Sequence, residues 1–293
     1  MEITVEVAKM KKLIITVAQT GGLHGKDINP ALPEQPKEIA QSAYDCYNAG
    51  ASVCHIHARD RQGRTTGDLE IYSEILNEIK AKSPIITQVG NGIGAVAMPD
   101  GTMRGATLDE RMPLTGIEPK PDMLTINMGT FEFDYIDSFE NPIKWNEEFV
   151  NKCNDRNIAI ECECYDISHI FNAMELVRRG VLKEPVHFSL VLGVAGGMPF
   201  TPKLMSTMID TLPEGSSWQV ITISKLQLPS TVMAMCQGAN IRTGLEDNIY
   251  YSKGVLAKSN AQLVERMVRI AREIGREVAT VEEAAELMGV KRE

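Results

Sequence analysis

One short stretch of sequence decides both the fold and the site: Ala51-Ser-Val-Cys-His55-Ile-His57-Ala-Arg-Asp60. Its apolar half, residues 52–57, has the pattern of a buried β-strand. Alternate residues of a strand share a face, so His55 and His57 point the same way, about 7 Å apart along the strand. Two such imidazoles can chelate one metal ion. The competing interpretation is a pair of hydrogen-bonded core histidines, and the spacing alone leaves both open.

Similar short apolar runs recur along the chain, and helix-length amphipathic stretches separate many of them. The expected strands are residues 13–18, 52–57, 85–88, 123–127, 159–163, 186–192, 219–223 and 240–243. The expected helices are residues 36–49, 69–82, 168–180, 201–210, 230–238 and 258–275, with an extra C-terminal helix at 280–290. This alternation favours an α/β fold, a (β/α)8 TIM barrel rather than a doubly wound open sheet. Because no linker or repeat interrupts the pattern, residues 1–293 are expected to form a single barrel domain.

The composition is that of a globular cytoplasmic protein, with 43% hydrophobic and 24% charged residues and a formal net charge of -9. We expect no nucleic-acid partner, because that would require a basic stripe. We also expect no membrane span, since no apolar run reaches the roughly 18 residues needed. We expect no secretion signal, because the start lacks the basic-then-apolar order and the apolar run after it is too short. The six cysteines are scattered, which favours reduced thiols over disulfides.

A third metal ligand is suggested by the segment Arg242-Thr-Gly-Leu-Glu246-Asp247-Asn248, which follows the eighth expected strand. Barrel enzymes build their active sites at the carboxyl ends of the strands, where both this segment and His57 should lie. Two histidines and one carboxylate with an open position form a known pattern for catalytic zinc. The alternative role for Glu246 and Asp247 is helix capping, since acidic residues favour the first turn of a helix.

The fifth expected strand directs either two thiols or two carboxylates inward. Cys162 and Cys164 share one face, and Glu161 and Glu163 share the other. We favour Glu163 facing the site, because inward polar residues near the carboxyl end of a barrel usually serve the site. The cysteines are then small apolar core residues.

Two glycine-rich stretches follow expected strands, namely Gly90-Asn91-Gly92-Ile-Gly94 and Gly193-Val-Ala-Gly196-Gly197-Met-Pro199. Their glycines allow backbone N–H groups to approach an anion or a carbonyl closely. Neither stretch matches a Walker or dinucleotide motif, so an ordinary loop is the alternative for each.

Together these segments resemble the β-keto acid cleavage enzymes along nearly the whole chain. The matching stretches are residues 13–18 with 29–33, 49–57, 121–129, 192–199 and, most specifically, 244–254 (Gly-Leu-Glu-Asp-Asn-Ile-Tyr-Tyr-Ser-Lys-Gly). The resemblance implies a zinc-dependent (β/α)8 barrel that converts a β-keto acid and acetyl-CoA into acetoacetate and a new acyl-CoA. It also implies a homotetramer or homodimer with small-molecule partners.

The resemblance further implies roles for particular residues. Its metal ligands fall on His55, His57 and Glu246, although other divalent ions suit such a set. Its catalytic residues fall on Asp247, Arg242 and Glu163. The expected substrate contacts are Thr125, Gly90, Asn91, Leu23 and Asn127.

The implied chemistry is physically coherent. Zinc would polarise the ketone oxygen and make the adjacent carbon more acidic. Asp247 would act as the base, oriented by Arg242. The enolate would attack the acetyl thioester, and CoA transfer with retro-Claisen cleavage would release acetoacetate. Two alternatives are a CoA-independent, metal-dependent lyase or aldolase on the same barrel, and a non-catalytic metal-binding scaffold.

Two positions depart from the pattern of the family's aminohexanoate enzyme. Leu23 stands where that enzyme has a glutamate suited to an ammonium group, and a leucine cannot pair with this charge. Gly90 replaces a serine, which removes a hydroxyl contact and is expected to leave room. The sequence therefore predicts an apolar, bulky or anionic β-keto acid rather than 3-keto-5-aminohexanoate.

Overall fold

The computed structural model describes residues 11–22, 24–97, 103–135 and 137–292. Parallel strands close into a barrel in which each strand neighbours the next along the chain. Around the barrel they are β1 (Ile15–Ala18), β2 (Val53–Ile56), β5 (Ile86–Val89), β8 (Met123–Asn127), β11 (Ala159–Cys164), β12 (His187–Leu192), β13 (Ser217–Thr222) and β14 (Asn240–Thr243). The predicted (β/α)8 barrel is confirmed, and the open sheet is wrong, because β1 pairs with both β2 and β14.

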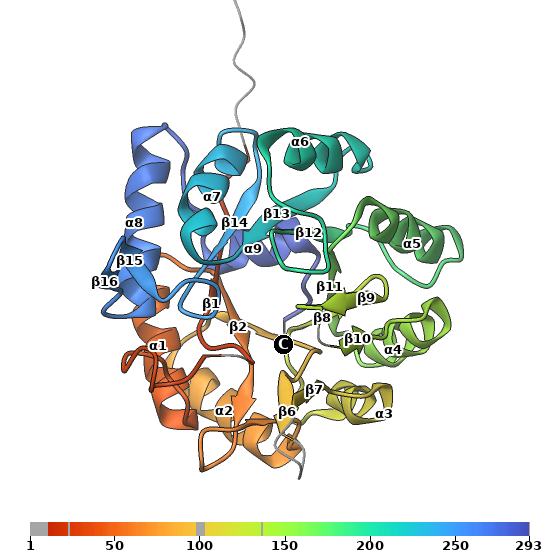
Figure 1. Ribbon diagram of the computed structural model, residues 1–293, viewed down its shortest axis with the longest axis horizontal. Helices are drawn as coiled ribbons and strands as arrows, with labels where there is room; N and C mark the ends of the chain where they lie inside the picture. The colour runs from red at the N-terminus through yellow and green to blue at the C-terminus, as the bar shows by residue number, and fades with distance from the viewer. Residues whose placement is uncertain (1–10, 23, 98–102, 136, 293) are drawn as a thin grey trace, which may run out of the picture.

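A ring of helices surrounds the barrel (Figure 1). They are α1 (Pro36–Ala49), α2 (Leu69–Lys82), α3 (Leu108–Arg111), α4 (Ile143–Asp155), α5 (Ile167–Arg178), α6 (Pro202–Thr211), α7 (Gln227–Met235) and α8 (Asn260–Glu273), with 3-10 turns at Met112–Gly116 and Ser224–Leu226. Helices α1 and α2 match their predicted bounds. Their starts are fixed locally: Pro36 occupies the first turn of α1, and the Asp68 carboxylate accepts from the Glu70 N–H.

The sequence pattern gave no prediction for α4, and it placed α7 three residues too late. Helix α4 buries Asn146, Phe149, Val150 and Cys153, which have regular helical spacing. The periodic signal was therefore present in the sequence and was missed.

Short antiparallel hairpins extend the loops after several barrel strands. They are β3–β4 (Ala58–Arg59 and Thr65–Thr66), β6–β7 (Ala95–Ala97 and Met103–Gly105), β9–β10 (Phe131–Phe133 and Asp137–Phe139) and β15–β16 (Tyr250–Ser252 and Val255–Leu256). Each follows the carboxyl end of a barrel strand, so the hairpins build up the rim of the barrel at the end where the site is expected.

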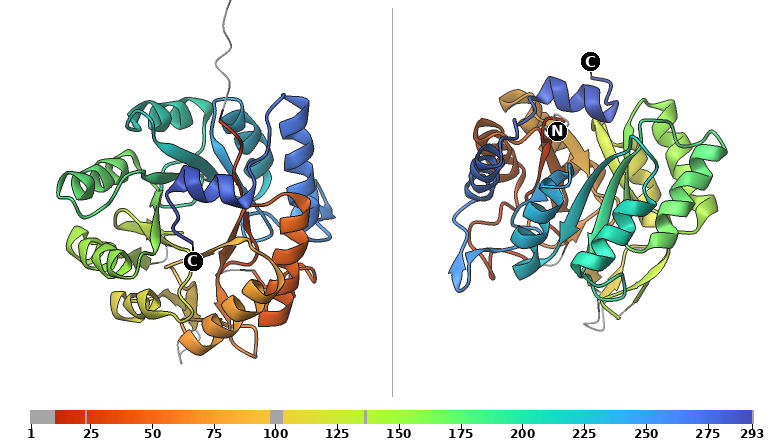
Figure 2. Two further views of the ribbon diagram at one scale, coloured as in Figure 1. Left: turned by 180° about the vertical axis from the view of Figure 1, so that it is seen from behind. Right: turned by 90° about the horizontal axis from the view of Figure 1, so that it is seen from above.

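The last helix, α9 (Val281–Met288), lies across the opposite, amino-terminal end of the barrel (Figure 2). Its buried face includes Ala284 and Met288. These side chains pack in one apolar cluster with the inward-facing residues Ile14, Val53, Ile86 and Met123. The predicted extra C-terminal helix is therefore present, and it plugs the barrel.

Above this apolar layer the barrel interior is polar. The fully buried Glu161 carboxylate accepts hydrogen bonds from Ser189 Oγ (2.7 Å), Gln88 Nε2 (2.7 Å) and Gln219 Nε2 (3.3 Å). A buried carboxylate requires such donors, because an unpaired charge in the interior is costly. Barrels of this kind are usually filled by branched apolar residues, so the polar layer is a distinctive feature of this chain.

The six cysteines all lie within the described ranges, and none forms a disulfide. Cys162 and Cys164 belong to the apolar layer between barrel and helices, as predicted, so Glu161 and Glu163 point inward. No helix of the described ranges is long and apolar enough to cross a membrane.

The packing of α9 across the amino-terminal end of the barrel predicts an effect on stability. Replacing Met288 by Ala should lower the free energy of unfolding by about 2–3 kcal/mol, because truncating a buried methionine leaves a cavity. Urea unfolding measures the change. Glu286→Ala alters an exposed position of the same helix and should shift the midpoint little. Equal effects of the two substitutions would show that α9 does not close the barrel as described.

Candidate metal centre and active site

His55, His57 and Glu246 meet at the carboxyl end of the barrel. The two Nε2 atoms are 3.2 Å apart, and Glu246 Oε1 lies 3.7 Å from His55 Nε2 and 3.8 Å from His57 Nε2. Zinc bonds of about 2.0–2.1 Å in a tetrahedral site would separate ligand atoms by roughly 3.3 Å. The three side chains thus need only small movements to share one ion.

Two glycines let Glu246 reach this position. Gly244 has a φ of +144°, and a Cβ there would lie 1.9 Å from Ala18 O. A Cβ at Gly21 would lie 2.5 Å from Glu246 Cγ. The Glu246 N–H donates to Ala18 O at 3.2 Å. The loop after β14 therefore packs tightly on the end of β1, which only glycine permits at these two positions.

The segment 29–33 supports the same loop from outside. Asn29 Nδ2 donates to Ile249 O and to Ala257 O, each at 3.0 Å. Leu32 packs in one cluster with Leu245. Two stretches that carried the family resemblance are thus in contact, and together they hold the loop that bears Glu246.

A glutamine orients His55. Gln88 Oε1 lies 2.8 Å from His55 Nδ1, while Gln88 Nε2 donates to Glu161 Oε2 at 2.7 Å. Because an amide oxygen can only accept, Nδ1 carries the proton and Nε2 presents its lone pair to the site. Burial, followed by the charge of Arg242, lowers the pKa of both histidines, that of His57 to about 4. Both rings are therefore neutral, as metal binding requires.

Arg242, on β14, lies close to three carboxyl groups. Its Nε and Nη2 donate to the two oxygens of Asp247, each at 2.9 Å, and Nη2 also donates to Glu246 Oε1 at 2.6 Å. Glu163 Oε1 lies 3.8 Å from Nη1. Burial by itself would lower the pKa of Arg242, but the neighbouring carboxyl groups keep this pKa well above the usual value. This bidentate arrangement fixes Asp247 firmly.

Burial raises the pKa of the three carboxyl groups. The pKa of Glu163 rises to about 8, although Arg242 acts in the opposite direction. The pKa values of Glu246 and Asp247 are raised as well. A carboxylate whose pKa lies above the ordinary value is a stronger base, so Asp247 is suited to accept a proton from carbon.

This donor set fits a divalent cation. Two neutral imidazoles and one carboxylate are ligands that zinc accepts with a further position open, and other divalent ions accept them too. Glu246 Oε2 is buried and has no hydrogen-bond partner among the described residues. One guanidinium cannot neutralise the carboxylates of both Glu246 and Asp247, so a second cation would stabilise the cluster. The identity of the ion and the catalytic roles stay predictions.

Three of the expected substrate contacts form a connected polar wall. Asn127 Nδ2 donates to Asn91 Oδ1 at 2.9 Å, and the Asn91 N–H donates to Thr125 Oγ1 at 3.3 Å. Asn91 Nδ2 and Asn127 Oδ1 are buried without a partner in the described part of the chain. Buried polar groups normally have partners, so a free donor and a free acceptor here are suited to a polar ligand.

The structure corrects the expectation of free room at Gly90. A Cβ at this residue would lie 2.4 Å from His57 Nε2 and 3.0 Å from His55 Nε2. The space beside Gly90 is taken by the two imidazoles, because β2 and β5 are neighbours and the rings lean over the end of β5. The other departure, Leu23, lies outside the described residues.

Sequence reasoning missed Gln88 as a partner of His55, and it also missed Arg59. Arg59 Nη2 donates to Gly21 O and His24 O, each at 2.6 Å, and so holds the loop after β1 beside the site. The signal was available in the spacing, because Arg59 follows His57 by two residues and extends the His-x-His alternation.

Comparisons with known proteins agree with this geometry. A family model described as beta-keto acid cleavage enzyme matches residues 12–290. The chain is 37% identical to the 3-keto-5-aminohexanoate cleavage enzyme of Fusobacterium nucleatum, over 97% of this chain and all of that enzyme. It is 31% identical to the 3-oxoadipate:acetyl-CoA acetyltransferase of Cupriavidus necator, over 94% of each. The apo structure of ObcA shares the fold, with a TM-score of 0.72 at 17% identity, over 89% of this chain and 66% of ObcA.

The glutamine that orients His55 yields one prediction. Gln88→Met removes the acceptor of the Nδ1 proton without a large change in volume, so zinc affinity should fall about 10- to 100-fold. Competition of the metal-free protein with a chromogenic chelator measures this. Gln19→Met is the matched control, because Gln19 is equally buried and its Nε2 donates to Cys54 Sγ. Unchanged affinity in the Gln88 variant would exclude the orienting role.

The close contact between Gly90 and the His57 ring yields another prediction. In Gly90→Ala the new methyl group must displace the His57 ring, and overpacking of about 1–3 kcal/mol would weaken zinc binding about tenfold or more. Gly92→Ala is the control, because a Cβ there would meet its nearest neighbour, Phe139, at 3.9 Å. Equal zinc affinity of the two variants would contradict the placement of His57 against Gly90.

Proposed function

The chain belongs to the β-keto acid cleavage enzyme family, and on this premise we propose that it converts a β-keto acid and acetyl-CoA into acetoacetate and a new acyl-CoA. We further propose that it does so with zinc held by His55, His57 and Glu246. The observation that carries the proposal is Arg242, which binds Glu246 and Asp247 together. The relative named 3-oxoadipate:acetyl-CoA acetyltransferase supports acetyl-CoA as the co-substrate.

The first chemical task is to remove a proton from the carbon between ketone and carboxylate. A divalent cation bound at the three ligands would polarise the ketone oxygen and make this carbon more acidic. Asp247 takes the proton, favoured by the raised pKa that burial gives it. Arg242 holds both Asp247 oxygens, so the base keeps one orientation throughout.

The remaining steps balance without an oxidant or a reductant. The enolate carbon forms a bond to the acyl carbon of acetyl-CoA, and the CoA thiolate leaves. The thiolate then adds to the original ketone carbon, and the bond between that carbon and the enolate carbon breaks. Asp247 returns its proton to the new carbanion, which gives acetoacetate and an acyl-CoA. The positive charge of Arg242 stabilises the negative charge that develops nearby.

We propose an apolar, bulky or anionic β-keto acid as the substrate. The relative from Fusobacterium nucleatum is named for 3-keto-5-aminohexanoate, whose ammonium group calls for a negative partner. Leu23 offers no such charge. The free Nδ2 donor of Asn91 suits the carboxylate or keto oxygen that every β-keto acid carries.

The base role of Asp247 predicts a large kinetic effect. Asp247→Asn keeps the shape and one acceptor for Arg242 but cannot take a proton, so the rate should fall about 10²- to 10⁴-fold. The assay supplies a panel of β-keto acids with acetyl-CoA and measures acetoacetate and the mass of the new acyl-CoA. Asp122→Asn is the control, because Asp122 accepts from Thr87 at the far end of the barrel.

Two outcomes would contradict the proposal. Keto acid consumption without acetyl-CoA and without acetoacetate would indicate a CoA-independent lyase or aldolase. Equal rates in the Asp247 and Asp122 variants would mean that Asp247 is not the base.

A further inference from the structure

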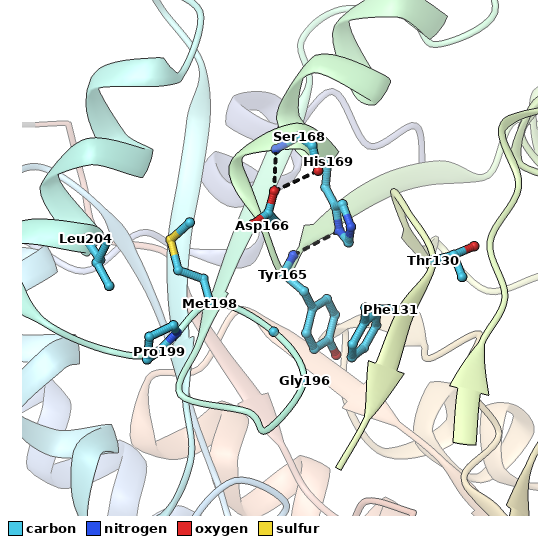
Figure 3. A pocket seen from close by; sticks show the side chains of 11 residues that line it. Thr130, Phe131, Tyr165, Asp166, Ser168, His169, Gly196, Met198, Pro199 and Leu204 are labelled. Carbon is cyan, nitrogen blue, oxygen red and sulfur yellow. Dashed lines mark hydrogen bonds between the residues drawn. The ribbon is translucent and has the colours of Figure 1, made fainter. Parts of the chain in front are cut away.

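A cavity of about 600 Å³ opens among the loops that follow β8, β11 and β12 (Figure 3). Its lining includes Phe131, Tyr165, His169, Met198 and Leu204. These loops leave the carboxyl ends of their strands, and this is the barrel end that carries the metal centre. No step of the proposed reaction above uses this cavity.

The loops that form the walls of the cavity are held in place by a backbone hydrogen bond and by a glycine in close contact with β9. The Met198 N–H donates to Tyr165 O at 2.8 Å, which ties the loop after β12 to the end of β11. Gly196 has a φ of +87°, and a Cβ there would lie 1.4 Å from Glu132 O. A glycine is therefore required where this loop crosses β9. The glycine-rich stretch after β12 thus shapes a cavity wall.

His169 offers a hydrogen-bond donor that the protein leaves unused. Only 4% of its surface is exposed, and its Nδ1 accepts the Tyr165 N–H at 3.2 Å (Figure 3). Burial lowers the pKa of His169, so the ring is neutral and its single proton resides on Nε2. No described residue forms a hydrogen bond with Nε2. Nε2 is not among the fully enclosed unpartnered atoms, so it remains accessible from the cavity, where a ligand can accept its proton.

Besides His169, the lining has polar side chains at Thr130, Asp166 and Ser168, and most of its other side chains are apolar. The rings of Phe131 and Tyr165 stack with centroids 4.1 Å apart, and Met198, Pro199 and Leu204 add aliphatic surface. This combination suits a slender ligand whose amide carbonyls alternate with methylene groups. The pantetheine arm of coenzyme A has this chemistry.

The cavity also lies within reach of the catalytic groups. Tyr165 follows Glu163 by two residues, which corresponds to about 7 Å along an extended chain. Glu163 Oε1 in turn lies 3.8 Å from Arg242 Nη1. A ligand in the cavity could therefore present its end to the place where the proposed acyl transfer occurs.

We propose that this cavity binds the pantetheine arm of the acyl-CoA, with His169 Nε2–H donating to one of its amide carbonyl oxygens. The assignment rests on the proposed function, because that function supplies the thioester. It makes His169 a binding residue for the co-substrate and gives it no part in proton transfer.

Kinetics with two thioesters test the assignment. In His169→Asn, the shorter amide can still accept the Tyr165 N–H but no longer reaches the position of Nε2. The KM for acetyl-CoA should rise about 5- to 10-fold, which corresponds to one hydrogen bond of about 1–1.5 kcal/mol. The KM for the keto acid and the rate with S-ethyl thioacetate, which has no amide, should not change. His169→Gln restores a distal donor and should recover part of the loss.

Two kinetic results would overturn the assignment. One is an unchanged KM for acetyl-CoA in His169→Asn. The other is an equal loss of rate with S-ethyl thioacetate, which would mean that His169 acts on the chemistry or the fold.

Direct binding separates this assignment from the proposed function. Calorimetry with desulfo-CoA should show binding to the wild-type chain, weaker binding to His169→Asn, and strongly reduced binding to Met198→Trp, whose indole fills the cavity. Asn151→Trp, at an exposed site on α4, is the control and should bind as the wild type does. This pattern supports the assignment even if no keto acid is turned over. Absent binding, or equal binding by all four proteins, overturns it.

Discussion

The buried guanidinium of Arg242 is the interaction on which the site depends. It fixes Asp247 through two hydrogen bonds and Glu246 through a third, so one side chain places both the proposed base and a proposed metal ligand. Without it, three carboxyl groups would face one another in the interior, where an unpaired charge costs several kcal/mol. Because a single positive charge cannot balance the carboxylates of both Glu246 and Asp247, the same arrangement also favours a bound cation. The electrostatics of the fold and the proposed chemistry therefore have a common origin.

The barrel supports this site from below in two layers. Glu161 accepts hydrogen bonds from side chains on β5, β12 and β13, and through Gln88 it sets the proton on His55. Beneath it, α9 seals the amino-terminal end with an apolar cluster. His55 lies in β2 and His57 directly follows it, so barrel closure holds both histidines, while Glu246 comes from the loop after β14. That loop is held in turn by Gly244 and Asn29, which are also part of the family resemblance.

The barrel could be predicted from the sequence because its strands are short apolar runs. The alternation of side chains along a strand placed His55 and His57 on one face. The resemblance supplied the roles of Arg242 and Asp247, and spacing alone could not distinguish Glu246 and Asp247 from capping residues. Gln88 was missed because a polar residue within a strand gains meaning only from its register partner, and Gln88 pairs with His55. The expectation at Gly90 failed for a similar reason, since the space beside it is filled by rings from a neighbouring strand.

The most direct test of the central claim is hydrogen exchange at the carbon between ketone and carboxylate, followed by NMR in D2O without acetyl-CoA. If the metal ligands and Asp247 act together on this carbon, the zinc-loaded protein should accelerate exchange well above the spontaneous rate. Both removal of zinc by a chelator and the substitution Asp247→Asn should then abolish the acceleration. Acceleration that persists in the metal-free protein, or in the Asp247 variant, would contradict the account.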